Sequence, residues 1–153
     1  MGFMLESWTA SRKRKAIQTP KFYFFDTGVM HTLAGTRSLD RNSDLYGVSF
    51  EQFIGMELKS YLSYRRIKDA LTFWRTSHGF EVDYLIGEHT AIEVKATRNV
   101  AAKHSKGLKA LASEKMVEKM FLITHDPIAT KKDGIHAMHW ESFLGELWNG
   151  KII

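Results

Sequence analysis

Two carboxylates and one ammonium group lie close together on two expected neighbouring strands. Residues 79–86 carry Asp83, and residues 90–95 carry Glu93 and Lys95 in the order Glu-Val-Lys. Magnesium prefers hard oxygen ligands, usually one or two carboxylates completed by water and substrate oxygens. A metal ion held in this way neutralises a phosphodiester and activates water. The spacing therefore predicts a phosphodiester hydrolase that depends on Mg²⁺ or Mn²⁺.

Each polar group of this pair of strands has an expected part in the chemistry. Asp83 and Glu93 would hold the metal ion, and the backbone carbonyl of Val94 could add a third oxygen. Lys95 shares a strand face with Glu93, about 7 Å further along, where it could position water or balance charge. Glu81 is a weaker candidate, because it shares the face of Asp83 but lies one pleat away.

Both strands alternate apolar and polar residues, which is the pattern of half-buried β-strands. The alternation places Asp83 on one face of the first strand and Glu93 with Lys95 on one face of the second. Residues 87–89 are expected to form the turn between them. The opposite face of the first strand is expected to hold Phe80, Val82, Tyr84 and Ile86.

A long helix is expected before these strands. Residues 50–62 carry an apolar stripe at helical period, and Ser49 with Gln52 has the spacing of a capping box. Glu57 falls inside the stripe and needs a partner, because an unpaired buried carboxylate is costly. Glu57 could complete the acidic side of the site, or it could lie at the edge of a narrow stripe. Glu51 is interpreted as a favourable charge near the helix start.

The whole pattern predicts an α/β protein of α+β-like type, with a mixed sheet of about 4–5 strands flanked by helices. A helix between the third and fourth main strands indicates a parallel crossover. Further strands or extended segments are expected at residues 21–25, 71–76, 119–124 and 135–139. Further helices are expected at residues 29–33, 101–116 and 140–147.

The bulk composition excludes several classes of protein. The 153 residues are 44% hydrophobic and 25% charged, as in soluble globular domains. No run approaches the roughly 20 apolar residues of a membrane span, and no signal peptide is visible. Without cysteine there are no disulfides and no thiolate metal sites. We therefore expect a cytoplasmic protein without a membrane partner.

Positive charge is concentrated in two segments of the chain. The net charge is +5, and basic residues gather in residues 1–20 and 96–119. Clustered positive charge favours polyanions, so DNA is the expected partner. The other interpretation is a solvated helix face together with a flexible basic stretch. The candidate DNA-contacting residues are Arg75, Arg98, Lys103, Lys106 and Lys109.

Two other motifs have simpler interpretations. Asp26-Thr27-Gly28 matches the signature of aspartic proteases, but an enzyme of this length would need a homodimer to pair two aspartates. Asp26 more simply caps a short helix, and Gly28 permits the turn. His136 and His139 lie three residues apart on an expected strand, so they point to opposite faces and do not form a zinc motif.

The order of these features resembles the PD-(D/E)XK nuclease superfamily. A helix with a glutamate precedes a strand with Asp83, a strand with Glu93 and Lys95, a helix and a further strand. Residues 20–28, 50–58, 73–76 and 81–83 further resemble the C-terminal domain, of unknown function, of a prokaryotic family of AAA+ ATPases.

This resemblance covers about residues 12–125. It implies a restriction-endonuclease-like αβββαβ core, with Asp83, Glu93 and Lys95 as the nuclease triad. It also implies that Glu57 is the helix carboxylate of the site.

The chain departs from this family at its N-terminal side. It contains no G-x-x-x-x-G-K-S/T phosphate loop, so it cannot hydrolyse ATP in that way. Residues 12–15 resemble the end of a winged-helix segment, so residues 1–20 are expected to be a basic remnant and residues 21–153 a nuclease-like domain. We expect a fragment, an expressed domain or a truncated reading frame, with an AAA+ ATPase domain as a partner in cis or in trans.

The rival hypothesis is a catalytically silent module that binds DNA or protein and regulates an ATPase. The same basic helix would serve that role, while the intact Asp83, Glu93 and Lys95 favour the enzyme. The oligomeric state stays open.

Overall fold

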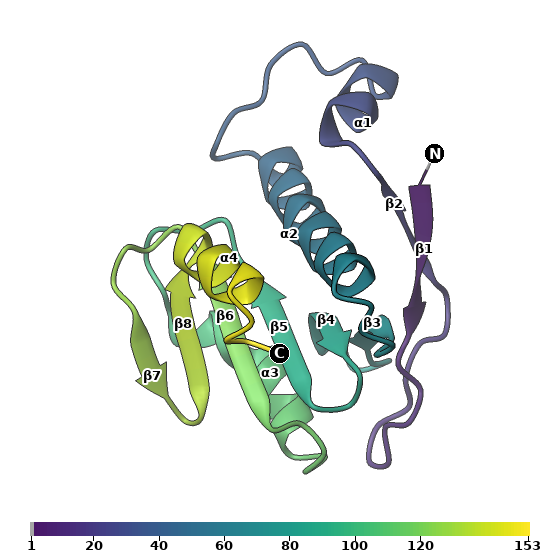
Figure 1. The fold of residues 1–153 in the computed structure, drawn as a ribbon, viewed down its shortest axis with the longest axis vertical. Helices are drawn as coiled ribbons and strands as arrows, with labels where there is room; N and C mark the ends of the chain where they lie inside the picture. Colours follow the sequence, from purple (N-terminus) through teal and green to yellow (C-terminus); the bar gives the residue numbers. More distant parts are fainter. Residues whose placement is uncertain (1) are drawn as a thin grey trace.

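A mixed sheet of eight strands forms the centre of the computed structural model, which describes residues 2–153 (Figure 1). The strands lie side by side in the order β2-β1-β3-β4-β5-β6-β8-β7. They are β1 (Gly2–Ser7), β2 (Lys21–Phe24), β3 (Leu71–Arg75), β4 (Glu81–Ile86), β5 (Thr90–Val94), β6 (Lys119–Thr124), β7 (Thr130–Lys132) and β8 (Ile135–His139).

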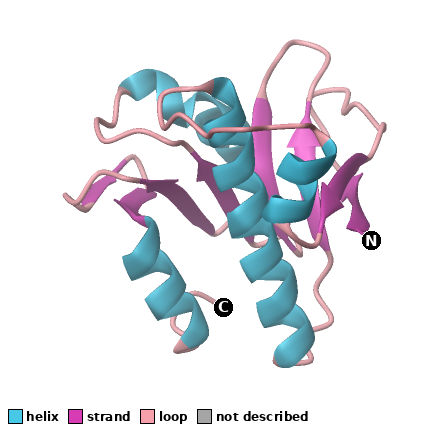
Figure 2. Ribbon diagram, turned by 90° about the horizontal axis from the view of Figure 1, so that it is seen from above, coloured by secondary structure: helices cyan, strands magenta, loops and turns pink. Residues whose placement is uncertain are grey.

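Helices cover both faces of the sheet. They are α1 (Thr27–Leu33), α2 (Asp44–Tyr64), the short 3₁₀ helix η1 (Ala102–Ser105), α3 (Lys106–Ala112) and α4 (Trp140–Trp148). α2 and α4 lie in front of the sheet in Figure 1 and α3 lies behind it, and Figure 2 shows the strands running between helices. In the described residues 2–153, no helix has the length and apolar character needed to cross a membrane.

The strand directions change at β5. β3, β4 and β5 are antiparallel neighbours, whereas β5, β6 and β8 are parallel. The connection from β5 to β6 passes through η1 and α3, so the predicted parallel crossover is confirmed. The main strands predicted from alternation are also confirmed as β3, β4, β5, β6 and β8.

The predicted number of about 4–5 strands was too small, because β1 and β7 carry weak sequence signals and β2 was expected only as a strand or extended segment. β1 precedes a basic stretch and Pro20, and β7 is a fully exposed edge strand of three residues. β1 lies between β2 and β3, so the predicted remnant 1–20 packs in the same sheet as residues 21–153 (Met1 lies outside the described residues). The Glu114 carboxylate also holds this segment by accepting the backbone N–H groups of Arg12 and Lys13 at 2.9 and 3.0 Å.

Two helix boundaries differ from the prediction. α2 begins at Asp44, because the Ser43 side chain accepts the N–H of Tyr46 at 3.2 Å and caps the first turn. The expected capping box was wrong, since Ser49 lies inside the helix and donates its hydroxyl to the Leu45 carbonyl at 2.6 Å. The helix expected at residues 101–116 is shorter and consists of η1 and α3.

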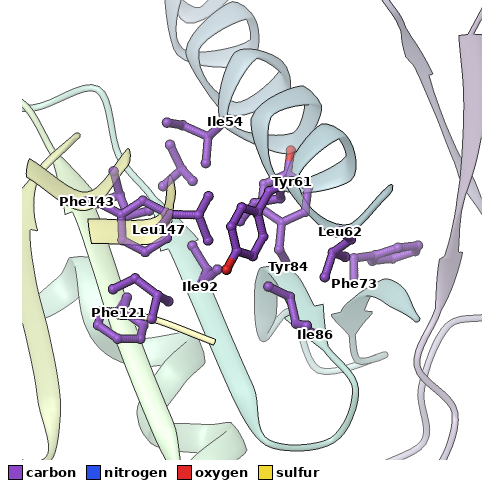
Figure 3. Packing of buried hydrophobic residues seen from close by; sticks show 14 of the residues in the cluster. Ile54, Tyr61, Leu62, Phe73, Tyr84, Ile86, Ile92, Phe121, Phe143 and Leu147 are labelled. Atoms are coloured by element: carbon purple, nitrogen blue, oxygen red, sulfur yellow. The ribbon is translucent and has the colours of Figure 1, made fainter. Parts of the chain in front are cut away.

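The larger part of the core lies between the sheet and the helices α2 and α4 (Figure 3). Fully burying a large apolar side chain contributes about 1.5–3 kcal/mol, so this layer fixes α2 over the middle of the sheet. The buried residues in contact here include Ile54, Leu58, Tyr61, Tyr84, Ile92, Phe121, Phe143 and Leu147.

α2 lies close to β4 at Gly55. The Tyr84 hydroxyl donates a hydrogen bond of 2.8 Å to the backbone carbonyl of Glu51, one turn earlier in the helix. A Cβ atom at Gly55 would lie only 2.4 Å from the Tyr84 hydroxyl oxygen. The missing side chain therefore allows α2 to sit against the strand that carries Asp83.

Replacing Gly55 tests this close approach. Gly55→Ala is expected to lower the free energy of unfolding by about 1–3 kcal/mol, because the new methyl group overlaps Tyr84. Gly47→Ala is the matched control in the same helix, since no heavy atom lies within 4 Å of its Cβ position. Alanine has the higher helix propensity, so the control should gain up to about 1 kcal/mol. Urea unfolding in which Gly55→Ala is as stable as Gly47→Ala would contradict the packing.

Candidate functional site

The candidate site lies where β4 and β5 separate. Their paired register ends at Tyr84 and Ile92, one residue before Asp83 and Glu93 would meet. On its other side β4 carries a β-bulge, because Asp83 and Tyr84 together oppose the single residue Phe73 of β3. Bulges bend a strand and redirect its side chains, and they are frequent beside active sites.

The bulge corrects the predicted faces of β4. Val82 packs in the core layer that contains α3, whereas Tyr84 and Ile86 pack in the layer that contains α2. The simple alternation that placed all three on one face was therefore wrong. Sequence periodicity cannot reveal an extra residue in a strand, because it assumes one side chain per pleat.

Beyond the end of the β4–β5 ladder, the carboxylate of Asp83 accepts a backbone hydrogen bond from β5 in place of a β4 carbonyl. Its Oδ2 atom accepts the backbone N–H of Val94 at 2.8 Å, and the residue is only 3% exposed. The N–H and C=O groups of one strand residue point to the same side. The Val94 carbonyl, predicted as a metal ligand, is therefore directed toward the side of β5 where Asp83 lies.

Lys95 joins the two carboxylates. Its Nζ atom lies 2.6 Å from Oε1 of Glu93 and 3.9 Å from Oδ2 of Asp83. Glu93 is 5% exposed, and its other oxygen, Oε2, is buried without a hydrogen-bond partner in the described part of the chain. The structure thus brings together Asp83, Glu93 and Lys95, the three residues that the sequence grouped.

Burial and the neighbouring charges shift the pKa values of all three groups in this cluster. Burial, reinforced by the charges of Glu93 and Glu51, raises the pKa of Asp83 well above its usual value. Burial also raises the pKa of Glu93 to about 7, although Lys95 opposes that change. Burial lowers the pKa of Lys95, but the Asp83 and Glu93 carboxylates outweigh it, so the pKa is raised and the ammonium stays charged.

The helix carboxylate beside the cluster is Glu51, and the prediction for Glu57 requires a correction. Glu57 Oε2 accepts the indole N–H of Trp148 at 2.9 Å, which holds it between α2 and α4. Glu51 instead acts electrostatically on the pKa values of Asp83 and Glu93. The two glutamates are six residues apart, or about one and two-thirds helical turns, so they point in different directions.

Sequence reasoning missed the partners of Glu51 on β2. The Tyr23 hydroxyl donates to Glu51 Oε1 at 2.6 Å, and Lys21 Nζ lies 3.2 Å from the same oxygen. Lys21 also lies 2.6 Å from Glu81, which receives two hydrogen bonds from Arg75 at 2.9 and 3.0 Å. The available signal was Lys21 itself, a charged residue that lies directly between Pro20 and the aromatic run of the expected strand.

The arrangement supplies two carboxylates to a metal ion and no more. Among residues 2–153, no group of three or more histidine, aspartate or glutamate side chains is placed to hold a metal. Asp83 and Glu93 would therefore be completed by the Val94 carbonyl, water and substrate oxygens, a set that suits magnesium.

The predicted DNA-contacting residues are placed in two ways. Arg98, Lys103 and Lys106 are exposed and follow β5 in the loop, η1 and the first turn of α3. Lys109 and Arg75 are engaged with carboxylates, Lys109 with Asp133 at 2.7 Å and Arg75 with Glu81. α3 is seated directly on β4, because a Cβ at Gly107 would overlap the Glu81 carbonyl. The basic segment therefore follows Lys95 closely in the chain and packs through α3 on β4, the strand that carries Asp83.

Comparison with known proteins gives a family for most of this region. Residues 46–143 match the model of a family described as a domain of unknown function, DUF4143. Two similar proteins, both uncharacterized, come from Mycobacterium bovis and Mycobacterium tuberculosis. Each is 31% identical over 107 residues, which covers 66% of this chain and 23% of the relative.

The chain thus spans about a quarter of the length of these relatives. No solved structure matches it significantly. The family match includes Glu51, Asp83, Glu93 and Lys95, whereas β1 and β2 lie outside it.

The raised pKa of Glu93 predicts how stability depends on pH without divalent ions. Between the ordinary glutamate value of 4.5 and about 7, the folded state binds a proton that the unfolded state has released. Stability contributed by this group is therefore lost as pH rises through that window, by up to about 3 kcal/mol. Glu93→Gln should remove this loss in urea unfolding followed from pH 4.5 to 7 in EDTA.

Other carboxylates also change stability with pH, so the informative quantity is the difference in the free energy of unfolding between variant and wild type at each pH. Glu57→Gln is the matched control, because Glu57 lies outside the cluster and binds Trp148. A Glu93→Gln profile parallel to wild type across the whole window would show that Glu93 titrates normally.

Proposed function

Since this chain belongs to the DUF4143 family of domains of unknown function, we propose an activity from its site: Mg²⁺- or Mn²⁺-dependent hydrolysis of DNA phosphodiesters. One observation carries the proposal. The buried carboxylates of Asp83 and Glu93 meet the partly exposed ammonium of Lys95 at the end of the β4–β5 ladder. Two carboxylates and one lysine at a break between strands form a combination suited to phosphodiester chemistry.

The cluster fits a divalent cation electrostatically. Two buried carboxylates face a single ammonium, and the pKa values of both are raised chiefly by burial, which Lys95 does not fully offset. Glu93 Oε2 is buried without a hydrogen-bond partner among the described residues, so it is available as a ligand. Asp83, Glu93 and the Val94 carbonyl would hold the ion. When bound, the ion would neutralise the phosphate and lower the pKa of a water molecule.

Lys95 would act as a fixed charge and a hydrogen-bond donor. The carboxylates raise its pKa, so it is unsuited to accept a proton at neutral pH. Beside Glu93 its ammonium can donate to an oxygen of the scissile phosphate or to the attacking water. The water would lose a proton to solvent as its oxygen bonds to phosphorus, one P–O ester bond would break, and the leaving oxygen would take up a proton from solvent. Such preorganised positive charge is most effective in a site that excludes water.

DNA is the proposed substrate because exposed basic residues follow the cluster in the chain. Arg98, Lys103 and Lys106 follow directly after β5 and carry positive charge toward solvent. The order α2, β3-β4-β5, α3, β6 also supports a restriction-endonuclease-like αβββαβ core as part of this proposal. The matched relatives extend well beyond this segment, and we propose an AAA+ ATPase domain, in cis or in trans, as its partner.

One observation favours a second candidate, a binding module without catalysis. Lys95 already lies 2.6 Å from Glu93, so the charge of the cluster is partly balanced without a metal ion. The same basic surface would then bind DNA or protein and regulate an attached ATPase. Metal binding separates the two candidates.

Calorimetric titration with Mg²⁺ and Mn²⁺ tests the metal site. Wild type and Glu57→Gln should bind one ion with the same affinity, because Glu57 lies apart from the cluster. Asp83→Asn should weaken binding at least tenfold, since a neutral amide replaces one of two charged ligands. Absence of binding to wild type at millimolar concentrations of either ion would favour the silent module.

Cleavage of supercoiled, linear and branched DNA tests the chemistry. Lys95→Ala should lower the rate by about 10²–10³-fold, as expected for the loss of one group that stabilises the transition state. Lys68→Ala removes one exposed positive charge beyond the far end of α2 and should leave the rate unchanged. Equal cutting by wild type and Lys95→Ala would identify a contaminating nuclease and contradict the proposal.

A further inference from the structure

A second candidate site lies at the edge of the sheet where the parallel strands end. The carboxyl ends of β5, β6 and β8 meet there, facing the first turns of α2 (Figure 1). Ligands of open parallel sheets bind at this edge. Two adjoining cavities of about 470 and 220 Å³ occur here, and both are lined by Tyr46 and His125.

The larger cavity is basic. Arg41 precedes α2, and Arg98 lies in the loop after β5; both side chains line the cavity and are exposed. Within residues 2–153, neither guanidinium has a carboxylate oxygen within 4.0 Å. A guanidinium offers several donors in a planar fork that matches a phosphate group. Two unpaired arginines on one rim therefore complement an anion of this kind.

The smaller cavity is aromatic. The rings of Phe50 and His125 stack with their centroids 4.4 Å apart, and Phe53 meets Trp140 edge-on at 5.7 Å. The Tyr46 hydroxyl lies 3.2 Å from Nε2 of His125, which holds the imidazole in place. Tyr46, Phe53, His125 and Trp140 are only half-buried, so ring surface stays accessible from the cavity.

His125 suits the stacking of a base at neutral pH. Burial, together with the charges of His139, Arg41 and Arg98, lowers its pKa, so the ring is an uncharged aromatic surface. Aromatic side chains bind bases of any sequence through stacking, and adjacent basic groups follow the backbone. The carboxylates of Asp126 and Glu141 are the nearest acidic groups along β6 and α4, and neither lines the smaller cavity.

We propose that this edge binds an unpaired nucleotide of single-stranded DNA, with its phosphate between Arg41 and Arg98 and its base against the aromatic residues around His125. A base inside a duplex is stacked on both sides and cannot enter such a cavity without leaving the helix. The inference rests on the proposed function in one respect. Ala96 and Thr97, which line the larger cavity, directly follow Lys95 in the chain, so the cavity adjoins the strand end that carries the hydrolytic cluster.

Fluorescence anisotropy of an end-labelled oligothymidine strand, measured in EDTA, tests the proposal without hydrolysis. Wild type should bind the strand at least tenfold more tightly than a duplex of equal length. His125→Ala should weaken binding about tenfold, and His125→Phe, which keeps a ring, should weaken it less. Replacing both Arg41 and Arg98 with alanine should reduce the slope of log affinity against log salt by about 1.4. Lys68→Ala, which removes one exposed positive charge at the opposite end of α2, is the control and should leave the affinity for the strand nearly unchanged.

Three results would overturn the proposal: equal affinity for duplex and strand, unchanged binding by all three variants in folded form, or equally strong binding of free thymidine monophosphate. Circular dichroism confirms folding, and the two exposed arginines keep the test valid if His125→Ala unfolds. Strand binding that depends on these residues without any metal binding would overturn the nuclease proposal alone. DNA cleavage by wild type together with equal affinity for strand and duplex would overturn this inference alone.

Discussion

The hydrogen bond from the Val94 N–H to the Asp83 carboxylate is the interaction on which the site depends. It occupies the point where the β4–β5 ladder stops, and it holds a charged group at 3% exposure inside the sheet. Burying a carboxylate is costly unless hydrogen bonds and opposite charges compensate it. Here the compensation consists of one backbone donor and one lysine shared with Glu93. The protein therefore maintains a buried cluster that is deficient in positive charge.

The surrounding elements hold this cluster in place. The bulge opposite Phe73 redirects Asp83, and α2 is fixed to β4 by the hydrogen bond from Tyr84 to the Glu51 carbonyl. Gly55 and Gly107 let helices approach β4 from its two faces, because neither carries a side chain at the contact. The basic segment after β5 follows from the same crossover that makes β5 and β6 parallel. The bulge in β4, the contacts of the two helices and the basic segment are thus all placed around the point where β4 and β5 separate.

The sequence was sufficient for the main strands, the crossover and the grouping of Asp83, Glu93 and Lys95, because alternation and spacing are local properties. It was insufficient for Glu51, since choosing between two glutamates on one helix requires the rotation of α2 about its axis, which tertiary packing sets. It was also insufficient for β1, whose pairing with β3 joins residues far apart in the chain. The arginine and aromatic residues beside His125 come from three separate segments, so no single motif could identify them.

The central claim is that the two carboxylates are held in a site that a divalent cation would complete. Carbon-detected NMR titration of the Glu93 side-chain carboxyl measures this directly. In EDTA the carboxyl should titrate near pH 7, and with saturating Mg²⁺ its titration should move well below neutrality because the ion favours the ionised form. Titration near the ordinary glutamate value, unchanged by Mg²⁺ or Mn²⁺, would contradict the account.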